Sequence, residues 1–497
     1  MSEQQRHRRH RRHRRQRTDR RWLPWVLGFG VVFVLAMFLV ALSSIDVAPR
    51  KLAAYLSYRA EGHSSFFTAP TDAFASLLTR LDRGAQTPAV TYPAWAGAVT
   101  TSAPQSAPRA TQLVDSAETL RDAIAKAKPG ERIEILPGTY KLSGSSIGVD
   151  HGGTEGAPIT LAAAKLGDVT LEFDLLEGFR VSAPYWRFEN LVIRGVCKDD
   201  GDCEHAFHVV GAAAHVEIRN NRIEDFNAQI KVNGESGRFP DAGVVEANSL
   251  IANHPRRTGH PVTPIDAVAV NGWRIRNNLI VDFIKRDGDG ISYAAFVKGG
   301  GRDNHFEENV VLCEYRLRGQ PGMRVGLSLG GGGTDPSVCR DHRCITEQEI
   351  SVVRDNLIAF CSDDGLYLNR ASGSLVVQNT LLDTAGLGLR GEETSGRFSG
   401  NLLDGGIRAR EGADLEYADN QISGRFGAYF GHHPVRSLFR DPDSLDLAWT
   451  DKAPEGSLPI AEGVGPKETD LCGKLRPAKP AQGAFEDYGA CLRRKNS

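Results

Sequence analysis

The sequence lacks the motifs that would place a metal or a nucleotide. Its eight cysteines contain no C-x₂-C pair and no Cys and His spacing typical of a zinc site. Its run of four glycines, residues 330–333, stands outside the G-x-x-x-x-G-K-[ST] and G-x-G-x-x-G contexts of phosphate loops. These absences argue against a zinc protein and against ATP binding. We therefore expect disulfides at the cysteines and no dedicated metal site.

The chain also has almost no net charge, −1, but this average hides an asymmetry. Residues 1–21 hold ten arginines and only Glu3 and Asp19 as acids. The remainder carries 50 Lys and Arg against 59 Asp and Glu. Such a basic, histidine-containing tail can suggest nucleic acid or metal as a partner. The compartment inferred next argues against nucleic acid.

Charge is absent from one stretch, residues 25–45, which reads WVLGFGVVFVLAMFLVALSSI. About 20 apolar residues suffice for a helix to cross a bilayer core of ~30 Å. Trp22 and Trp25 stand at its start, where interfacial aromatics are found, and no A-x-A cleavage site follows it. We predict an uncleaved anchor over residues 22–45, in the inner membrane. The basic tail, residues 1–21, would then be cytoplasmic and the rest periplasmic.

The cysteines suit that location, because an oxidising compartment allows disulfides. Cys197 and Cys203, Cys339 and Cys344, and Cys472 and Cys491 are close in sequence, while Cys313 and Cys361 flank an insertion. The sequence does not fix their connectivity.

Composition divides the remaining chain into three parts. Residues 46–110 form a juxtamembrane segment and a linker rich in Pro, Ala, Ser and Thr, which is typical of a semi-extended tether. Residues 111–440 form the main domain, and residues 441–497 are a C-terminal extension. The main domain begins with an expected amphipathic helix at residues 115–127, with Asp115 as N-cap and Glu118 three residues later.

A repeated unit then dominates the sequence. It consists of an apolar residue, two mostly polar residues, Asn, and further apolar residues, as in IRNNLIV and FEENVVL. Nine asparagines mark it: Asn190, Asn221, Asn248, Asn278, Asn309, Asn356, Asn379, Asn401 and Asn420. Their spacing varies through insertions but does not fall far below 20 residues.

This pattern predicts an all-β fold, a right-handed parallel β-helix. Coils that pair ~4.8 Å apart stack identical residues into ladders, and Asn can bond its equivalents above and below while the chain turns. The helix at 115–127 would cap the open end. A β-sandwich, the alternative, would show turn signals every ~8–12 residues without a shared Asn phase.

Cations end several strands before the Asn units. Three of them lie 9 to 11 residues before an Asn, Lys298, Arg370 and Arg390, and Arg410 follows the same rule. Equal distances predict one positively charged track along the coil, which favours an acidic polysaccharide as partner. The alternative is that these strand ends simply face water. The candidate substrate-binding residues are Lys231, Asn271, Arg370, Arg390, Arg408 and Arg410.

Cleavage of a uronate chain by β-elimination requires neutralisation of the carboxylate, a base and an acid. A lysine can serve as the base when burial or nearby cations lower its pKa. Lys298, in AFVKGGGRDN, is the candidate base, with Arg324 or Arg318 assisting and His305 and Tyr293 as further helpers.

Residues 115–140 and the following GTEGAPITLAA resemble the chondroitinase B and alginate lyase family of polysaccharide lyases. The resemblance covers roughly residues 115–420 and implies a parallel β-helix, lyase activity, Lys298 as the catalytic lysine and Ca²⁺ as a candidate cofactor. Two acidic calcium ligands of the family have no counterpart in ISYAAFV before Lys298, and Leu329-Gly330 replaces its His-Gly. A uronate C5-epimerase and a non-catalytic binding or export factor remain alternative functions. The oligomeric state stays open.

Overall fold

The computed structural model describes residues 37, 47–60, 62–100, 110–331, 333–456 and 469–494. The chain divides into two compact units, residues 1–46 and 47–497, and the second contains every helix and strand named below. In the described part of the chain, no helix has the length and apolar composition needed to cross a membrane. Apart from Met37, the predicted anchor lies outside the described residues.

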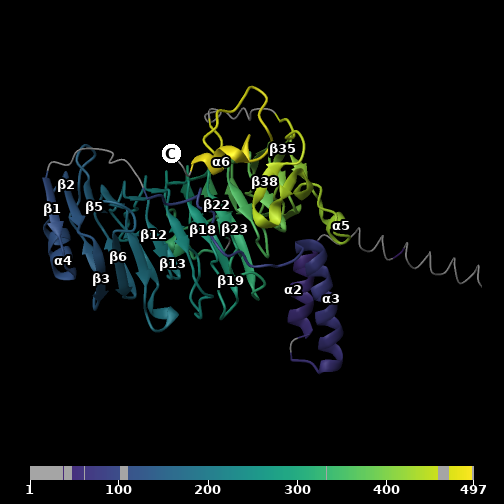
Figure 1. The fold of residues 1–497 in the computed structure, drawn as a ribbon, viewed down its shortest axis with the longest axis horizontal. Helices are drawn as coiled ribbons and strands as arrows, with labels where there is room; N and C mark the ends of the chain where they lie inside the picture. Colours follow the sequence, from purple (N-terminus) through teal and green to yellow (C-terminus); the bar gives the residue numbers. More distant parts are fainter. Residues whose placement is uncertain are drawn as a thin grey trace, which may run out of the picture. The chain divides into compact units, whose positions relative to one another are not determined.

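Three long parallel sheets form the main domain, and successive coils of the chain add strands to these sheets in turn (Figure 1). This confirms an all-β fold with the architecture of a parallel β-helix. The 12-stranded sheet contains β1 Ala110–Val114, β2 Glu131–Ile135, β5 Ile159–Ala163, β8 Trp186–Glu189, β11 Glu217–Arg219, β14 Val244–Glu246, β17 Arg274–Arg276, β21 His305–Glu307, β25 Val352–Arg354, β29 Ser374–Val377, β32 Gly396–Ser399 and β35 Glu416–Ala418.

The other two long sheets follow the same order along the coil. The 11-stranded sheet contains β3 Gly138–Ser143, β6 Val169–Asp174, β9 Val192–Gly195, β12 Arg222–Glu224, β15 Ser249–Ile251, β18 Leu279–Val281, β22 Val310–Leu312, β26 Leu357–Ala359, β30 Thr380–Leu382, β33 Leu402–Leu403 and β36 Gln421–Ile422. The 10-stranded sheet contains β4 Ile147–Val149, β7 Glu177–Val181, β10 His205–Val210, β13 Ala228–Asn233, β16 Ile265–Val268, β19 Ile291–Lys298, β23 Met323–Leu329, β27 Leu366–Asn369, β31 Gly386–Arg390 and β34 Gly406–Arg410.

Shorter elements complete the described chain. A three-stranded sheet contains β20 Gly301–Arg302, β24 Gln348–Glu349 and β28 Ala371–Ser372, and an antiparallel pair contains β37 Phe439–Asp441 and β38 Asp446–Trp449. The helices are α2 Pro49–Ala60, α3 Ser65–Arg83, α4 Ala117–Lys126, α5 Arg425–Ala428 and α6 Tyr488–Arg494.

The interior of the coil is a stack of apolar columns, one residue per strand. In the 12-stranded sheet one such column is Leu161, Phe188, Ile218, Val245, Ile275, Phe306, Val353, Val376 and Phe398, all buried. Parallel pairing in register places like residues in contact, so each coil buries its apolar face against its neighbours. The parallel register therefore follows from the repeat in the sequence.

The asparagine ladder is present, with one correction. Eight of the nine predicted residues, from Asn221 to Asn420, are linked by amide-to-amide hydrogen bonds of 2.9–3.2 Å. Asn190 is not aligned with them, because the register pairs it with Asn220 and places Leu191 at the ladder position. The residue before each ladder asparagine has positive φ, +55° at Asp355 for example, and this turns the chain.

Replacement of one ladder asparagine should be costly. Asn356 is fully buried, its amide donates to Phe306, Arg354 and Asn379, and its Oδ1 accepts from Asn309. We expect Asn356→Ala to lower the free energy of unfolding by about 3 kcal/mol, because it leaves buried partners unsatisfied. Urea unfolding measures the loss. The exposed Asn253→Ala is the control, and an equal loss in both variants would contradict a structural role for the ladder.

Helix α4 lies against β1 to β4 at the N-terminal end of the coil, where a cap was predicted. Its N-cap is Ser116 and not Asp115, because the Ser116 hydroxyl accepts from the backbone of Thr119 and Thr119 bonds back. The prediction of Asp115 as N-cap was wrong by one residue.

A second core covers the outer face of the 11-stranded sheet. From β15 onward this face is apolar, with Ile251, Leu279, Val310 and equivalent residues buried. Phe439 covers it, together with Leu447, Phe485 and other residues of the C-terminal extension. Residues 86–100, predicted as a tether, contribute Ala89, Tyr92, Trp95 and Ala96 to the same cluster.

All eight cysteines form disulfides, as expected. The pairs are Cys197–Cys203, Cys313–Cys361, Cys339–Cys344 and Cys472–Cys491. The fourth joins α6 to Cys472 within the C-terminal extension, and the second ties neighbouring coils together.

Candidate functional site

Lys298 ends β19 on the outer face of the 10-stranded sheet. Side chains alternate along a strand, so Ala295 and Val297 enter the core while Phe296 and Lys298 point outward. Lys298 is half-buried, and its ammonium lies 4.3 Å from the centre of the Phe296 ring. The strand therefore presents a lysine on a partly apolar surface.

The predicted positive track is present in part. By register, Lys298 is level with Gly330 and Asn369, and Asn369 pairs with Arg390, which pairs with Arg410. We call Lys298, Asn369, Arg390 and Arg410 the Lys298 column. Arg370 falls outside it, one residue past β27.

Arg370 departs because its backbone turns there, with φ +55°, and its guanidinium donates to the Cys344 carbonyl. Within the column, Arg390 is paired with Glu411 at 2.8 Å. The prediction that Arg370 joins Lys298 on one line was therefore wrong, because a count of residues does not detect the turn.

A second outward column runs beside the first. In register it contains Arg180, His208, Lys231, Asp266, Phe296, Ser328, Tyr367, Gly388 and Arg408. Two predicted residues, Lys231 and Arg408, belong to it. Lys231 forms an ion pair with Asp266 at 2.8 Å, and His208 bonds Glu177 and Asn233. The face is thus mixed in charge and not uniformly positive.

The surroundings of Lys298 favour a neutral amine. Burial lowers the pKa of Lys298 below its ordinary value, and the nearby Lys231 ammonium lowers it further. Asp266 and Glu347 act in the opposite direction without cancelling the effect. Among the described residues, none forms an ion pair with Lys298. These are the conditions under which a lysine can accept a proton.

Glu347 reaches this site from the insertion that carries the Cys339–Cys344 disulfide. It is fully buried, and its Oε2 accepts from the Gly331 backbone and the Thr334 hydroxyl, at 2.9 and 2.8 Å. A Cβ at Gly331 would lie 2.9 Å from Cδ of Lys298. The glycine therefore leaves the room that the lysine side chain occupies.

The residues present do not fit a calcium site. Glu347 Oε1 and Asp266 Oδ1 are buried and find no hydrogen-bond partner in the described chain. Two carboxylates beside an ammonium fall short of the 6–8 oxygen ligands, roughly, that Ca²⁺ takes. Across the described ranges, no group of three or more His, Cys, Asp or Glu could hold a metal ion.

Two tyrosines share the outer face with Lys298. Tyr293, a predicted helper, lies on the same strand, with its ring centre 5.8 Å from that of Phe296. Burial, Tyr367 and nearby acids raise its pKa to about 12, so it stays protonated. The Tyr367 hydroxyl accepts from the Asn369 amide at 3.0 Å. Both are hydroxyl groups that can donate a proton.

Helix α2 brings a further cation to this sheet. The Lys51 ammonium pairs with Asp363 and, at 2.8 Å, with Asp364. A Cβ at Gly388 on β31 would meet the Asp364 carboxylate, which places that carboxylate at the sheet surface. Burial and Asp363 raise the pKa of Asp364 to about 6.

The two arginines predicted to assist catalysis lie elsewhere. Arg324 is buried, pairs with Glu314 at 2.6 Å and donates to the Gln320 and Pro321 carbonyls. The Arg318 guanidinium stacks on the Phe360 ring and donates to the Asp443 carbonyl. The structure does not bring either arginine to Lys298, because both are held in buried contacts beneath α3.

The two remaining predicted residues lie at other surfaces. His305 belongs to β21 of the 12-stranded sheet, where its ring nitrogens contact Asp303 and Glu307. Asn271 lies at the corner after β16, and its Oδ1 accepts from the backbone of Arg302. It lines a cavity of about 320 Å³ with Arg302, Arg340 and Arg343 among others.

Sequence reasoning missed the acids of the site, Asp266, Glu347 and Asp364. The sequence could have indicated Asp266, since it occupies on β16 the strand position that Lys231 occupies on β13. No sequence pattern indicates Glu347, because only the folding of the insertion brings it close to Lys298.

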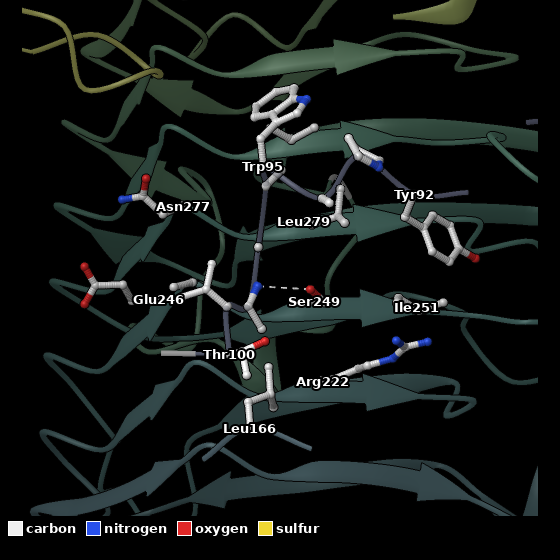
Figure 2. Close-up of a pocket in the computed structure, with 18 of the residues that line it drawn as sticks. Tyr92, Trp95, Thr100, Leu166, Arg222, Glu246, Ser249, Ile251, Asn277 and Leu279 are labelled. Atoms are coloured by element: carbon white, nitrogen blue, oxygen red, sulfur yellow. Dashed lines mark hydrogen bonds between the residues drawn. The ribbon is translucent and has the colours of Figure 1, made fainter. Parts of the chain in front are cut away.

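A cavity of about 1050 Å³ lies away from Lys298, on the outer face of the 11-stranded sheet. Figure 2 shows the segment from Trp95 to Thr100 running across the strands beside Leu279 and Ser249. The Ala98 backbone donates to the Ser249 hydroxyl at 3.0 Å, and Val99 exchanges two bonds with Asn220. This cavity contains no residue of either outward column.

Comparison with known proteins bears out the family resemblance over the N-terminal coils. Residues 114–236 match the model of the chondroitinase B family. Pectate lyase L of Dickeya chrysanthemi is 34% identical over 84 residues, which are 14% of this chain and 20% of that protein. Pectate lyase L of Dickeya dadantii (strain 3937) is 33% identical over 84 residues, with the same coverage. The chain thus spans about a fifth of the length of these curated relatives.

Solved structures of polysaccharide lyases also align with the chain. Pectate lyase Pel9A aligns with a TM-score of 0.40 at 16% identity, over 77% of this chain and 97% of that one. The alginate lyase AlyGC aligns with a TM-score of 0.33 at 16% identity, over 63% and 51%.

Proposed function

We propose that this protein is a membrane-anchored periplasmic polysaccharide lyase that cleaves an acidic, uronate-containing polymer by β-elimination. The observation that carries the proposal is the half-buried Lys298, whose lowered pKa favours a neutral amine on the outer face of the coil. The chondroitinase B match over residues 114–236 supports the reaction class. The pectate lyase relatives make polygalacturonate one substrate to test.

Lys298 acts as the base. Its neutral amine takes the proton from the carbon beside the uronate carboxylate, and the electron pair forms a double bond as the glycosidic C–O bond breaks. The leaving oxygen receives a proton from Tyr293 or Tyr367. The charged Lys231 and the Asn369 amide are the neighbouring groups able to face the carboxylate. The product is an unsaturated uronate at a new chain end.

The location rests on the sequence and on the disulfides. Residues 22–45 form the transmembrane helix, and the tail at 1–21 stays in the cytoplasm. The β-helix that follows is right-handed. Four disulfides suit an oxidising periplasm. The anchor would keep the enzyme at the periplasmic face of that membrane.

Ultraviolet absorbance of the unsaturated product tests the proposal. The full chain is incubated with alginate, chondroitin sulfate, dermatan sulfate and polygalacturonate, and absorbance growth on one of them is expected. A change in uronate composition by NMR without such growth would support an epimerase instead. Binding of a polymer with neither change would support an export factor. Either result would overturn the lyase proposal.

The pH dependence of the rate should follow the neighbours of Lys298. Because the neutral amine is active, the rate rises as the pH passes upward through the Lys298 pKa. Removal of the cation in Lys231→Met should move this limb to higher pH, and removal of the anion in Glu347→Gln should move it to lower pH. We expect shifts of roughly half a unit in each direction. Shifts of the same sign in both variants would contradict the arrangement.

A further inference from the structure

The helices α2 and α3 expose an unusual number of aromatic side chains. Eight Tyr and Phe side chains are exposed in the described residues, and five of these lie on the two helices: Tyr55, Tyr58, Phe66, Phe67 and Phe74. Phe66 is 79% exposed and Tyr58 is 73% exposed. Folded proteins usually scatter such residues singly, so a cluster marks a surface that meets a partner.

Two more exposed aromatics lie where the hairpin joins the coil. Phe426 of α5 and Phe430 lie with ring centres 5.3 Å apart. Between them in sequence, the Tyr429 hydroxyl donates to the Val47 carbonyl at 2.9 Å. His433 contacts the Leu81 carbonyl of α3 at 3.1 Å. Phe426 and Phe430 thus lie near the end of the hairpin where α2 begins and α3 ends, while Tyr58, Phe66 and Phe67 lie at its other end.

The chain before α2 indicates which partner covers these residues. The predicted anchor ends at residue 45, and only Asp46, Val47 and Ala48 separate it from Pro49 of α2. At ~3.3–3.6 Å per residue, these residues reach little more than 10 Å. The polar layer on each side of a bilayer core is roughly 5–8 Å thick, and Tyr and Trp favour it.

We propose that the α2–α3 hairpin lies against the lipid headgroups of the membrane that holds the anchor, with Tyr58, Phe66 and Phe67 in the interfacial layer. This contact rests on the anchor of the proposed function. Arg59 and Arg80, exposed on the same helices, add attraction to anionic headgroups. The hairpin is therefore a second point of membrane attachment after the anchor itself.

The hairpin is also fixed to the β-helix, so this contact would orient the candidate active face. Arg50 of α2 pairs with Asp82 of α3 at 2.7 Å and with Asp383 of the coil at 3.0 Å. Arg83 pairs with Glu314 at 3.3 Å. Because these ion pairs are buried, they hold the hairpin firmly against the coil. Contact of the hairpin with lipid would therefore fix the orientation of the sheet that carries Lys298.

Lipid quenching of a fluorophore tests the contact in the full chain. All eight native cysteines are in disulfides, so one introduced cysteine can be labelled alone. Phe66→Cys and the control Tyr417→Cys, exposed on β35, carry nitrobenzoxadiazole in nanodiscs of phosphatidylethanolamine and phosphatidylglycerol. We expect headgroup-level spin-labelled lipid to quench position 66 about twofold or more and to leave position 417 unchanged. Tyr58→Cys repeats the measurement at a second site.

The outcomes separate the two proposals. A chain that does not co-elute with the discs overturns the anchor, and this contact with it. A chain that co-elutes with positions 58 and 66 unquenched overturns the contact alone. A third result is self-quenching at position 66 that disappears at one chain per disc, with no quenching by lipid. This result would assign the surface to contact with a second copy of the chain and would also overturn the lipid contact.

Discussion

Arg50→Ala should destabilise the protein by about 3–5 kcal/mol, the largest stability effect we expect. Arg50 is buried, donates to both Asp82 oxygens and to the Cys361 carbonyl, and pairs with Asp383. Burial opposes its charged form, but Asp82 and Asp383 outweigh burial and raise the pKa of Arg50. Its removal leaves the buried Asp82 carboxylate without its paired cation and takes one of three arginines from the buried Asp383.

Urea unfolding and hydrogen exchange of α2 and α3 measure this effect together. The control is Arg59→Ala, on the same helix but exposed, which should change the unfolding free energy by less than about 0.5 kcal/mol. If the two variants unfold alike and the helices keep their protection from exchange, the buried ion pairs do not hold the hairpin to the coil.

Lys298→Ala should lower kcat on the confirmed polymer by roughly a thousandfold, because it removes the group that accepts the proton. KM should change far less, since Lys231 and Asn369 remain to contact the substrate. Steady-state rates of absorbance growth, together with polymer binding measured directly, separate the two quantities.

The matched control for that variant is Lys141→Ala, an exposed lysine on β3 of the 11-stranded sheet. It should retain full activity. Lys298→Arg adds a second check, because a guanidinium keeps the charge and remains protonated. Full activity in Lys298→Arg would show that the charge matters and proton transfer does not.

The fold could be predicted from the sequence because one residue type repeats at one corner of every coil. Eight of the nine predicted asparagines form the ladder. Asn190 lies outside it, because the register pairs Asn190 with Asn220 and places Leu191 at the ladder position. The N-cap was misplaced for a similar reason, since Asp115 and Ser116 are both good caps and only geometry selects Ser116. The ladder position and the N-cap position each differ from the prediction by a shift of one residue, which the sequence pattern does not resolve.

The candidate site was less predictable, because it combines residues from different coils. Distances to the next Asn placed Lys298, Arg390 and Arg410 correctly, but the turn at Arg370 is invisible in such a count. Arg324 begins an apolar strand and pairs with Glu314 below it, which sequence spacing does not reveal. The packing of residues 89–96 on an apolar sheet also depends on the folded coil.

Titration of Lys298 by NMR, with its amine carrying a ¹³C-methyl label and its signal assigned through Lys298→Arg, tests most directly whether this lysine is a base. We expect a pKa below the ordinary lysine value of about 10.4. We also expect that the pKa rises in Lys231→Met. A Lys298 that titrates at or above the ordinary value and does not respond to Lys231 would show that this lysine is not the base.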